Sequence, residues 1–326
     1  MSKGIGRLIQ FGIAKETVRG TPENAATFWV PFNDLSIDEK FNLVKDEQSR
    51  GIIEDSVDAK IVKKWAEGSI KAPIGDKHFP LMLFSLFGSL STSGPTDSSY
   101  THTINVGQSA QHQALSLFID DPLGGQDYKH GLGVLTSLEL AYEQGKYIEY
   151  TANLKSKKGA TATLTPASTS ENRFLPQHLV FKLASTQSGL TGASAQIIKS
   201  LTLKVDQGIE DDDVLGSTDP ADFLNKQFSI EGTVEALWQN ESDFKTFVQS
   251  GTQKAMRIDL INTDTIIGSA TNPSLRIDLY KVIFEPINRP FAVNDLVKQT
   301  LAFKAYYSTA DSKMAVLTAV NAQTSY

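Results

Sequence analysis

Apolar and polar residues alternate along most of the chain, a pattern typical of strands with one buried and one solvent-facing side. Parallel strands buried on both faces would read as continuous apolar runs instead. The pattern therefore predicts a mainly β protein with minor α content, of antiparallel sandwich or barrel type, and disfavours a doubly wound nucleotide-binding fold. The alternating segments are residues 115–120, 138–143, 148–155, 201–206, 227–236 and 300–305.

Two segments have helical spacing of apolar residues. We expect one helix between Asp76, a capping residue, and Gly88, and another between Asn240 and Gly251. Their apolar stripes are interpreted as core contacts rather than ligand contacts. The stripes are Phe79, Met82, Leu83 and Leu86 in the first helix, and Phe244, Phe247 and Val248 in the second.

Each predicted helix follows a predicted strand, and the sequences of these two strands are similar. Residues 65–72 read WAEGSIKA and residues 229–236 read SIEGTVEA, which places Gly68 and Gly232 164 positions apart. The order strand, long acidic loop, strand, helix and three strands occurs twice at nearly this offset. We interpret this as a tandem duplication, against the alternative of coincidence between two β-rich halves.

This interpretation divides the chain into two tandem units with arms at both ends. We expect one domain over residues 30–158 and a second over 178–309, joined by a polar linker at 159–177. Residues 1–29 and 310–326 are expected to be arms, the alternative for the first being a frayed terminus. Four residues of the first arm are too apolar for a tail that stays in water, and we expect them to contact a neighbouring subunit: Leu8, Ile9, Phe11 and Ile13. Deleting residues 1–18 should then leave a folded protein that stacks poorly.

Composition narrows the possible functions. The 326 residues include no Cys, which excludes disulfides and thiolate chemistry. The formal net charge of -6 argues against adhesion to phosphate backbones. We predict neither a signal peptide nor a membrane span, and expect synthesis in a cytoplasm.

Catalytic and metal-binding patterns are missing from the sequence. It has no nucleophile elbow, Walker loop or His-Glu-x-x-His motif, and its five histidines lack ligand spacing. We therefore expect no enzyme activity, cofactor or metal. The acidic run Glu210, Asp211, Asp212 and Asp213 lacks calcium-loop spacing. It remains open whether this run is a solvated loop, a contact to basic residues of a neighbouring subunit, or part of an acidic channel wall.

Several segments resemble the tail tube (major tail) proteins of long-tailed bacteriophages. The likeness rests on their number and order along nearly the whole chain. The segments are residues 4–12 (GIGRLIQFG), 64–68 (KWAEG), 113–117 (QALSL), 211–217 (DDDVLGS), 225–228 (NKQF) and 277–282 (IDLYKV).

The resemblance implies a structural protein of the virion. Family members close into rings whose inner sheets join around a lumen for DNA, and the rings stack through long loops and arms. A duplicated chain would reach six domains with three chains, as a trimer with pseudo-sixfold symmetry. The implied partners are further copies of the chain, and tail terminator, tape measure and distal tail proteins at the tube ends.

The resemblance also suggests roles for particular residues. Acidic residues of the two long loops are expected at inter-ring contacts: Asp46, Glu47, Glu54, Asp55, Glu210, Asp211, Asp212 and Asp213. Acidic residues of the alternating strands are expected to face the lumen: Glu139, Glu143, Glu149, Glu231, Glu235 and Asp259. The alternative function is a non-catalytic β-sandwich binding module that recognises a carbohydrate or a receptor.

Overall fold

A computed structural model of the chain describes residues 5–122, 125–237, 244–287, 291, 293 and 296–326. Strands make up 51% of the chain, which confirms the mainly β prediction. The strands and helix of residues 10–162 are β1 (Gln10–Lys15), β2 (Phe28–Val30), β3 (Asp34–Lys45), β4 (Ala59–Pro73), α1 (His78–Phe87), β5 (Gly88–Thr96), β6 (Ser99–Val106), β7 (Leu115–Asp120), β8 (Asp127–Tyr142), β9 (Glu149–Ser156) and β10 (Ala160–Ala162).

Residues 179–321 form a second series of elements. These are β11 (Leu179–Ala184), β12 (Ser200–Asp206), β13 (Ile209–Asp212), β14 (Asp222–Asn225), β15 (Ser229–Leu237), α2 (Lys245–Gln249), β16 (Lys254–Ile261), β17 (Ser274–Phe284), β18 (Lys298–Tyr306) and β19 (Ala315–Asn321). Short 3-10 helices lie at Gly6–Leu8, Pro176–His178 and Ser188–Leu190.

Eight antiparallel strands form what we call the central sheet, in the order β3-β4-β9-β8-β12-β15-β18-β17. The first four strands come from the first series and the last four from the second. The two groups meet where β8 pairs with β12, with Leu138 opposite Val205 and Tyr142 opposite Leu201. Hydrogen bonding therefore continues across the middle of the chain without a break.

Two outer layers pack against the central sheet. One has the order β1-β7-β8-β10, and the other has the order β11-β16-β17-β19. The long strands β8 and β17 each belong to an outer layer at their beginning and to the central sheet at their end. The hairpin β5–β6 extends the second layer through β19. The same order of pairing therefore occurs once in each series of strands.

The two glycines noted in the sequence occupy matching places in this arrangement. Gly68 lies opposite Ile37 of β3, and Gly232 lies opposite Leu203 of β12. A Cβ added to Gly68 would lie 1.7 Å from the carbonyl oxygen of Ser36, and one on Gly232 would lie 2.2 Å from that of Thr202. The close approach of a neighbouring strand explains why each of the two similar strand sequences has glycine at this position.

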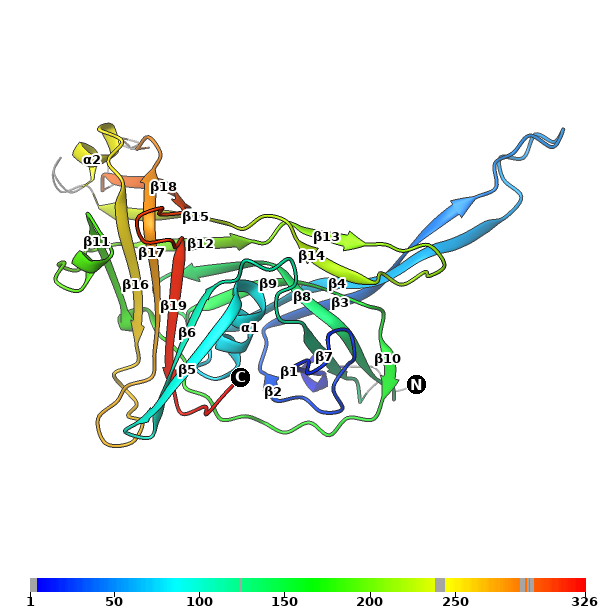
Figure 1. The fold of residues 1–326 in the computed structure, drawn as a ribbon, viewed down its shortest axis with the longest axis horizontal. Coiled ribbons are helices and arrows are strands. Elements are labelled where there is room, and N and C mark those ends of the chain that lie inside the picture. Colours follow the sequence, from blue (N-terminus) through cyan, green and yellow to red (C-terminus); the bar gives the residue numbers. More distant parts are fainter. Residues whose placement is uncertain (1–4, 123–124, 238–243, 288–290, 292, 294–295) are drawn as a thin grey trace.

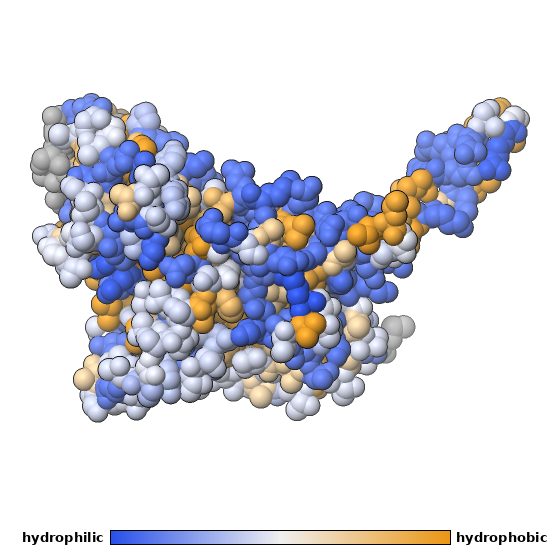
Figure 2. Space-filling view, viewed as in Figure 1, coloured by the Kyte–Doolittle hydropathy of each residue, from blue (hydrophilic) through white to orange (hydrophobic). Residues whose placement is uncertain are grey.

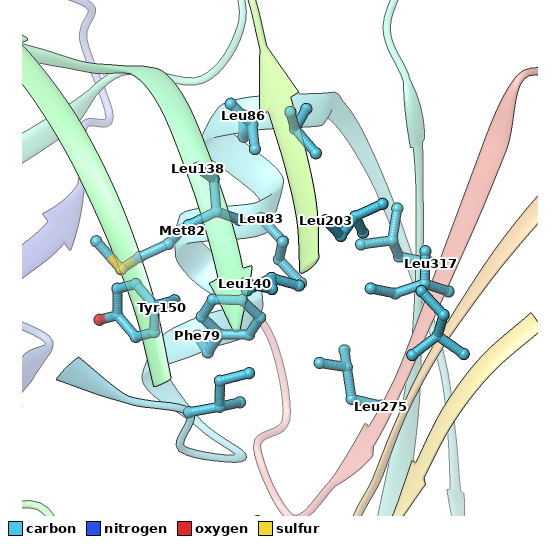
Figure 3. Packing of buried hydrophobic residues seen from close by; sticks show 14 of the residues in the cluster. Phe79, Met82, Leu83, Leu86, Leu138, Leu140, Tyr150, Leu203, Leu275 and Leu317 are labelled. Atoms are coloured by element: carbon cyan, nitrogen blue, oxygen red, sulfur yellow. The ribbon is translucent and has the colours of Figure 1, made fainter. Parts of the chain in front are cut away.

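The core lies between α1, the outer layers and one face of the central sheet. Figure 3 shows the side chains of Phe79, Met82, Leu83 and Leu86 pointing toward Leu138, Leu140 and Tyr150, and all four are at most 1% exposed. The four residues of the first helical stripe therefore lie in the core. In the second stripe Phe244 is buried, and Phe247 and Val248 pack partly buried against the same core.

The helix boundaries differ from the sequence expectation. Helix α1 begins at His78, whose backbone N–H donates to the Glu171 carboxylate at 2.9 Å, while the Asp76 carboxylate accepts hydrogen bonds from Asn172 instead of capping the helix. Gly88 ends α1 with φ +89°, as expected for a left-handed cap. Helix α2 covers only Lys245–Gln249, and the expected cap Asn240 lies outside the described residues.

The expected arms are in large part integral strands. Strand β1 pairs with β2 and β7, and Phe11 and Ile13 are fully buried in the chain's own core. The prediction that these two residues contact a neighbour is therefore wrong, because the chain itself covers them. Leu8 is exposed and Ile9 is partly exposed. At the other end, β19 pairs with β17 and β6, and the Tyr326 ring packs on Phe28 and His102.

Candidate functional site

The most prominent surface feature is a long hairpin that we call the arm, residues 41–62 at the outer end of β3 and β4. Figure 1 shows it projecting far from the body. Leu35 and Ile37 of β3 pack against the core, but farther along the same strand Phe41 and Leu43 are 55% and 50% exposed. The side of the hairpin that faces the core near the body thus continues beyond the body, where no described residue of this chain covers it.

The arm carries an unusual amount of exposed apolar surface. Its exposed apolar residues are Phe41, Leu43, Val44, Ile52, Ile53, Val57, Ile61 and Val62. Figure 2 shows this apolar surface as an orange stretch along the arm. Contiguous apolar patches on soluble proteins typically mark contact sites. The arm therefore has the character of a docking element.

The acidic residues predicted at inter-ring contacts in the first loop all lie at the tip of the arm. Asp46 forms an ion pair with Arg50, and Glu47, Glu54 and Asp55 are exposed. Sequence reasoning weighed these charges and missed the apolar residues between them. Ile53 is fully exposed. Its position in the sequence among acidic residues was the one sign that another surface covers this loop.

The second acidic loop is different, because its charges are largely paired within the chain. The Asp211 carboxylate lies between the ammonium groups of Lys63 at 2.6 Å and Lys155 at 2.6 Å, and Asp213 also contacts Lys63. Burial pushes the pKa of Asp211 upward, but hydrogen bonds from the two lysines outweigh it and hold that pKa below its usual value. The expected basic partners in a neighbouring subunit are thus replaced by lysines of the same chain.

The rest of this acidic run is more open. Glu210 forms an exposed ion pair with Lys226, and Asp212 is exposed on the opposite side of β13 from Asp211. Pairs this exposed contribute little to stability. Of the run, only Asp211 is held firmly by charged neighbours on two strands of the central sheet.

One face of the central sheet is covered by the core, and its other face carries polar side chains. Four of the six residues predicted to face a lumen lie on this solvent face: Glu139, Glu149, Glu231 and Glu235. Glu143 directly follows the last residue of β8 and is exposed. The prediction for Asp259 is wrong. Asp259 lies in outer strand β16, is 6% exposed and pairs with Arg276 at 2.9 Å. Alternation alone could not distinguish an outer strand from a central one.

Charges on the solvent face are arranged in a cross-strand row. Glu139 lies opposite Lys204, Lys204 opposite Glu231, and Glu231 opposite Lys304. Opposite charges at directly facing positions stabilise antiparallel pairs. The face is therefore mixed in charge, and Lys304 is a contributor that the sequence reasoning did not name.

The central sheet has two edges. Strand β3 pairs with β4 alone among the described strands. At the opposite edge, Glu285 continues past β17 and its amide donates to the Ala302 carbonyl of β18 at 2.8 Å. No described strand pairs on the far side of residues 285–287. Unpaired edges of this kind are templates for adding another strand.

Signs of other functions are few in the described part of the chain. No group of three or more His, Asp or Glu side chains there could hold a metal ion. None of the helices in the described ranges is long and apolar enough to cross a membrane.

Comparison with known proteins identifies a family that matches most of the chain. No curated protein matches the chain. Residues 6–305 match the family described as phage tail tube protein, a span that includes the arm, the whole first series of strands and the second series as far as β18. With two sheet edges open to strand addition, an apolar arm and a match over most of its length, this chain belongs to the phage tail tube protein family and is a non-catalytic structural component of the phage tail.

Proposed function

We propose that the chain is a duplicated tail tube subunit, and that three chains form each ring of the tube of a long-tailed phage. The observation that carries this proposal is the junction between β8 and β12. It joins two groups of four strands with the same pairing order and leaves one open edge at each end of the central sheet. Repeating this junction between chains would close a ring of six similar wedges with pseudo-sixfold symmetry.

The internal junction supplies a template for the junction between chains. By pairing order, β3 corresponds to β12, because Gly68 lies opposite Ile37 as Gly232 lies opposite Leu203. The segment after β17 corresponds to the end of β8. In this proposal the free edge of β3 in one chain pairs with residues 285–287 of the next, and no exposed edge remains to aggregate.

The proposed domain boundaries shift slightly from those expected. Strand β1 takes the place in the first unit that β11 takes in the second, and β10 and β19 also correspond. We therefore extend the proposed first domain, residues 30–158, to include β1 and β10. The second, residues 178–309, gains β19. The linker is then reduced to residues 163–177.

Closing the central sheet would turn its solvent face into the wall of a channel for DNA. The row of alternating charges offers DNA no continuous basic track. Each phosphate neutralised by a lysine would add salt-sensitive affinity, and neighbouring carboxylates offset it. The proposed lumen residues are Glu139, Glu143, Glu149, Glu231 and Glu235, with Lys204 and Lys304.

Stacking of rings is assigned to the arm. Its apolar residues would be buried against a second copy of the chain in the next ring, with the tip residues Asp46, Glu47, Glu54 and Asp55 at the same contact. Burial of each large apolar side chain contributes about 1.5–3 kcal/mol. Tail terminator, tape measure and distal tail proteins are the partners that the family suggests at the tube ends.

Cysteine cross-linking tests the junction between chains, because the natural chain has no Cys. In the internal junction Asp206 lies opposite Ser137. The counterpart of Asp206 is Lys40, because Leu203 of β12 corresponds to Ile37 of β3. The counterpart of Ser137 is Glu285, because Ser137 lies opposite Asn153 of β9 in the same way as Glu285 bonds to Ala302 of β18. The variant Lys40→Cys with Glu285→Cys should form disulfides between chains, giving closed trimers on a denaturing gel.

The matched control is Ser137→Cys with Asp206→Cys, which should close within one chain. If that control cross-links internally while the Lys40–Glu285 variant stays monomeric in assembled tubes, the proposed junction is wrong. A series of cross-linked bands that ends at six chains would refute the trimer but support the proposed junction.

A further inference from the structure

The hairpin formed by β13 and β14 is held against the first series of strands through residues of β14. The Arg19 guanidinium donates to both oxygens of Asp222 at 2.9 and 3.0 Å, and to the carbonyls of His112 and Phe223. The Phe223 ring is fully buried in a small cluster with Ala114, Leu132 and Val134. Strand β14 of the hairpin is therefore fixed to the body by charge and by packing.

Strand β13, in which Asp211 lies directly opposite Phe223, contacts the place where the arm leaves the body. Asp211 bridges Lys63 of β4 and Lys155 of β9, and Asp213 adds a second contact to Lys63 at 2.5 Å. Farther along, the Thr218 carbonyl accepts the backbone N–H of Lys64 at 2.8 Å. Figure 1 shows β13 and β14 lying along this part of β4.

The lysines at this contact are well held. Their side chains are 17% and 19% exposed, and both ammonium groups lie over the Trp65 ring, at 5.6 and 5.7 Å from its centre. Beyond this point β3 and β4 continue as a two-stranded ribbon. An isolated ribbon of two strands is marginally stable and free to bend, so its direction depends on what holds its base.

We propose that the β13–β14 hairpin is a brace that sets the direction of the arm, with Asp211 as its positioning residue. The brace connects the buried Phe223 anchor to the base of the arm through the Asp211 bridge. Its importance for tube assembly rests on the docking role proposed above for the arm. Its effect on arm direction does not, and it can be measured on the isolated subunit.

The experiment compares Asp211→Asn with Asp212→Asn, which removes the adjacent charge at an exposed position on the opposite side of β13 from Asp211. Spin labels are placed at Ser49→Cys in the arm tip and Thr161→Cys in β10, both exposed. We expect a broadened distance distribution in Asp211→Asn, a distribution like that of the natural sequence in Asp212→Asn, and recovery in Asp211→Glu. The Lys64 amide should exchange at least about tenfold faster in Asp211→Asn.

Lys155→Met is the second variant. It removes the lysine partner of Asp211 in β9 and keeps a side chain of similar length. Unchanged label distributions in both Asp211→Asn and Lys155→Met would overturn the brace, as would broadening that only accompanies a loss of overall melting temperature. If the natural sequence forms no tubes but Asp211→Asn still broadens the distribution, the proposed tube function fails and the brace stands.

Discussion

At the residue scale, the two phenylalanines Phe79 and Phe41 show how position decides the role of an aromatic side chain. Phe79 in α1 is fully buried and packs on the Tyr150 ring at 4.9 Å. Phe41 in the arm is 55% exposed. The helical spacing around Phe79 was readable from the sequence. The exposure of Phe41 was not, because it lies in a strand whose neighbours leave it uncovered.

We predict opposite effects for the two truncations. Phe79→Ala should lower the free energy of unfolding of the isolated subunit by about 3–5 kcal/mol, because it leaves a cavity in the core. Phe41→Ala should change that free energy by no more than about 0.5 kcal/mol but impair tube formation. Urea unfolding measures the first effect and sedimentation of tubes the second. A large stability loss in Phe41→Ala would contradict its placement.

Acid should weaken the anchor of the β13–β14 hairpin. Burial pushes the pKa of Asp222 upward, but hydrogen bonds from Arg19 and the Phe223 amide outweigh it and hold the pKa below its usual 3.8. A lowered folded-state pKa contributes stability above pH 3.8 that is lost as the pH falls through the lower value. The natural sequence should therefore be more stable than Asp222→Asn near neutral pH.

Urea unfolding at a series of pH values, from about 6 down to about 3, checks this prediction. The stability difference between the natural sequence and Asp222→Asn should be constant at the upper end and shrink below 3.8. Asp212→Asn, at an exposed site, is the control. A difference that grows in acid would show that Asp222 is not held as an anion.

At the element scale, β1 and the arm explain most of what the sequence concealed. In β1, Phe11 and Ile13 alternate with Gly12 and Ala14, and all four are buried because β1 is covered on both faces. A strand that is buried on both faces shows no alternation of polar and apolar residues in its sequence. The central strands β8, β9, β12, β15 and β18 have such a face, and their pattern predicted them well.

Deletions at these two elements should behave differently. Removing residues 1–18 takes away β1 and should prevent folding, contrary to the expectation from the sequence alone. Replacing residues 46–58 by a short turn should leave a folded subunit with a native circular dichroism spectrum. That variant should form rings but not tubes, as seen by electron microscopy. A soluble, folded 1–18 deletion would show that β1 is dispensable.

At the scale of the whole molecule, the paired order of the strands connects fold to function. The sequence predicted two copies of one order of elements, and it did so through Gly68 and Gly232, which a neighbouring backbone approaches closely. It could not reveal that the copies share one sheet, because pairing between β8 and β12 is a long-range contact with no local pattern. The position of Glu139 opposite Lys204 depends on that contact, and the outer position of Asp259 depends on the equally long-range pairing of β16 with β11.

The central claim is that three chains, each with two equivalent wedges, close one ring of the tube. Cryo-electron microscopy of assembled tubes, with chains counted in each ring, tests it most directly. The account predicts three chains per ring, with β3 of each chain paired to the segment after β17 of the next and the solvent face of the central sheet lining the channel. A ring of six chains, or β3 edges left unpaired around the ring, would contradict it.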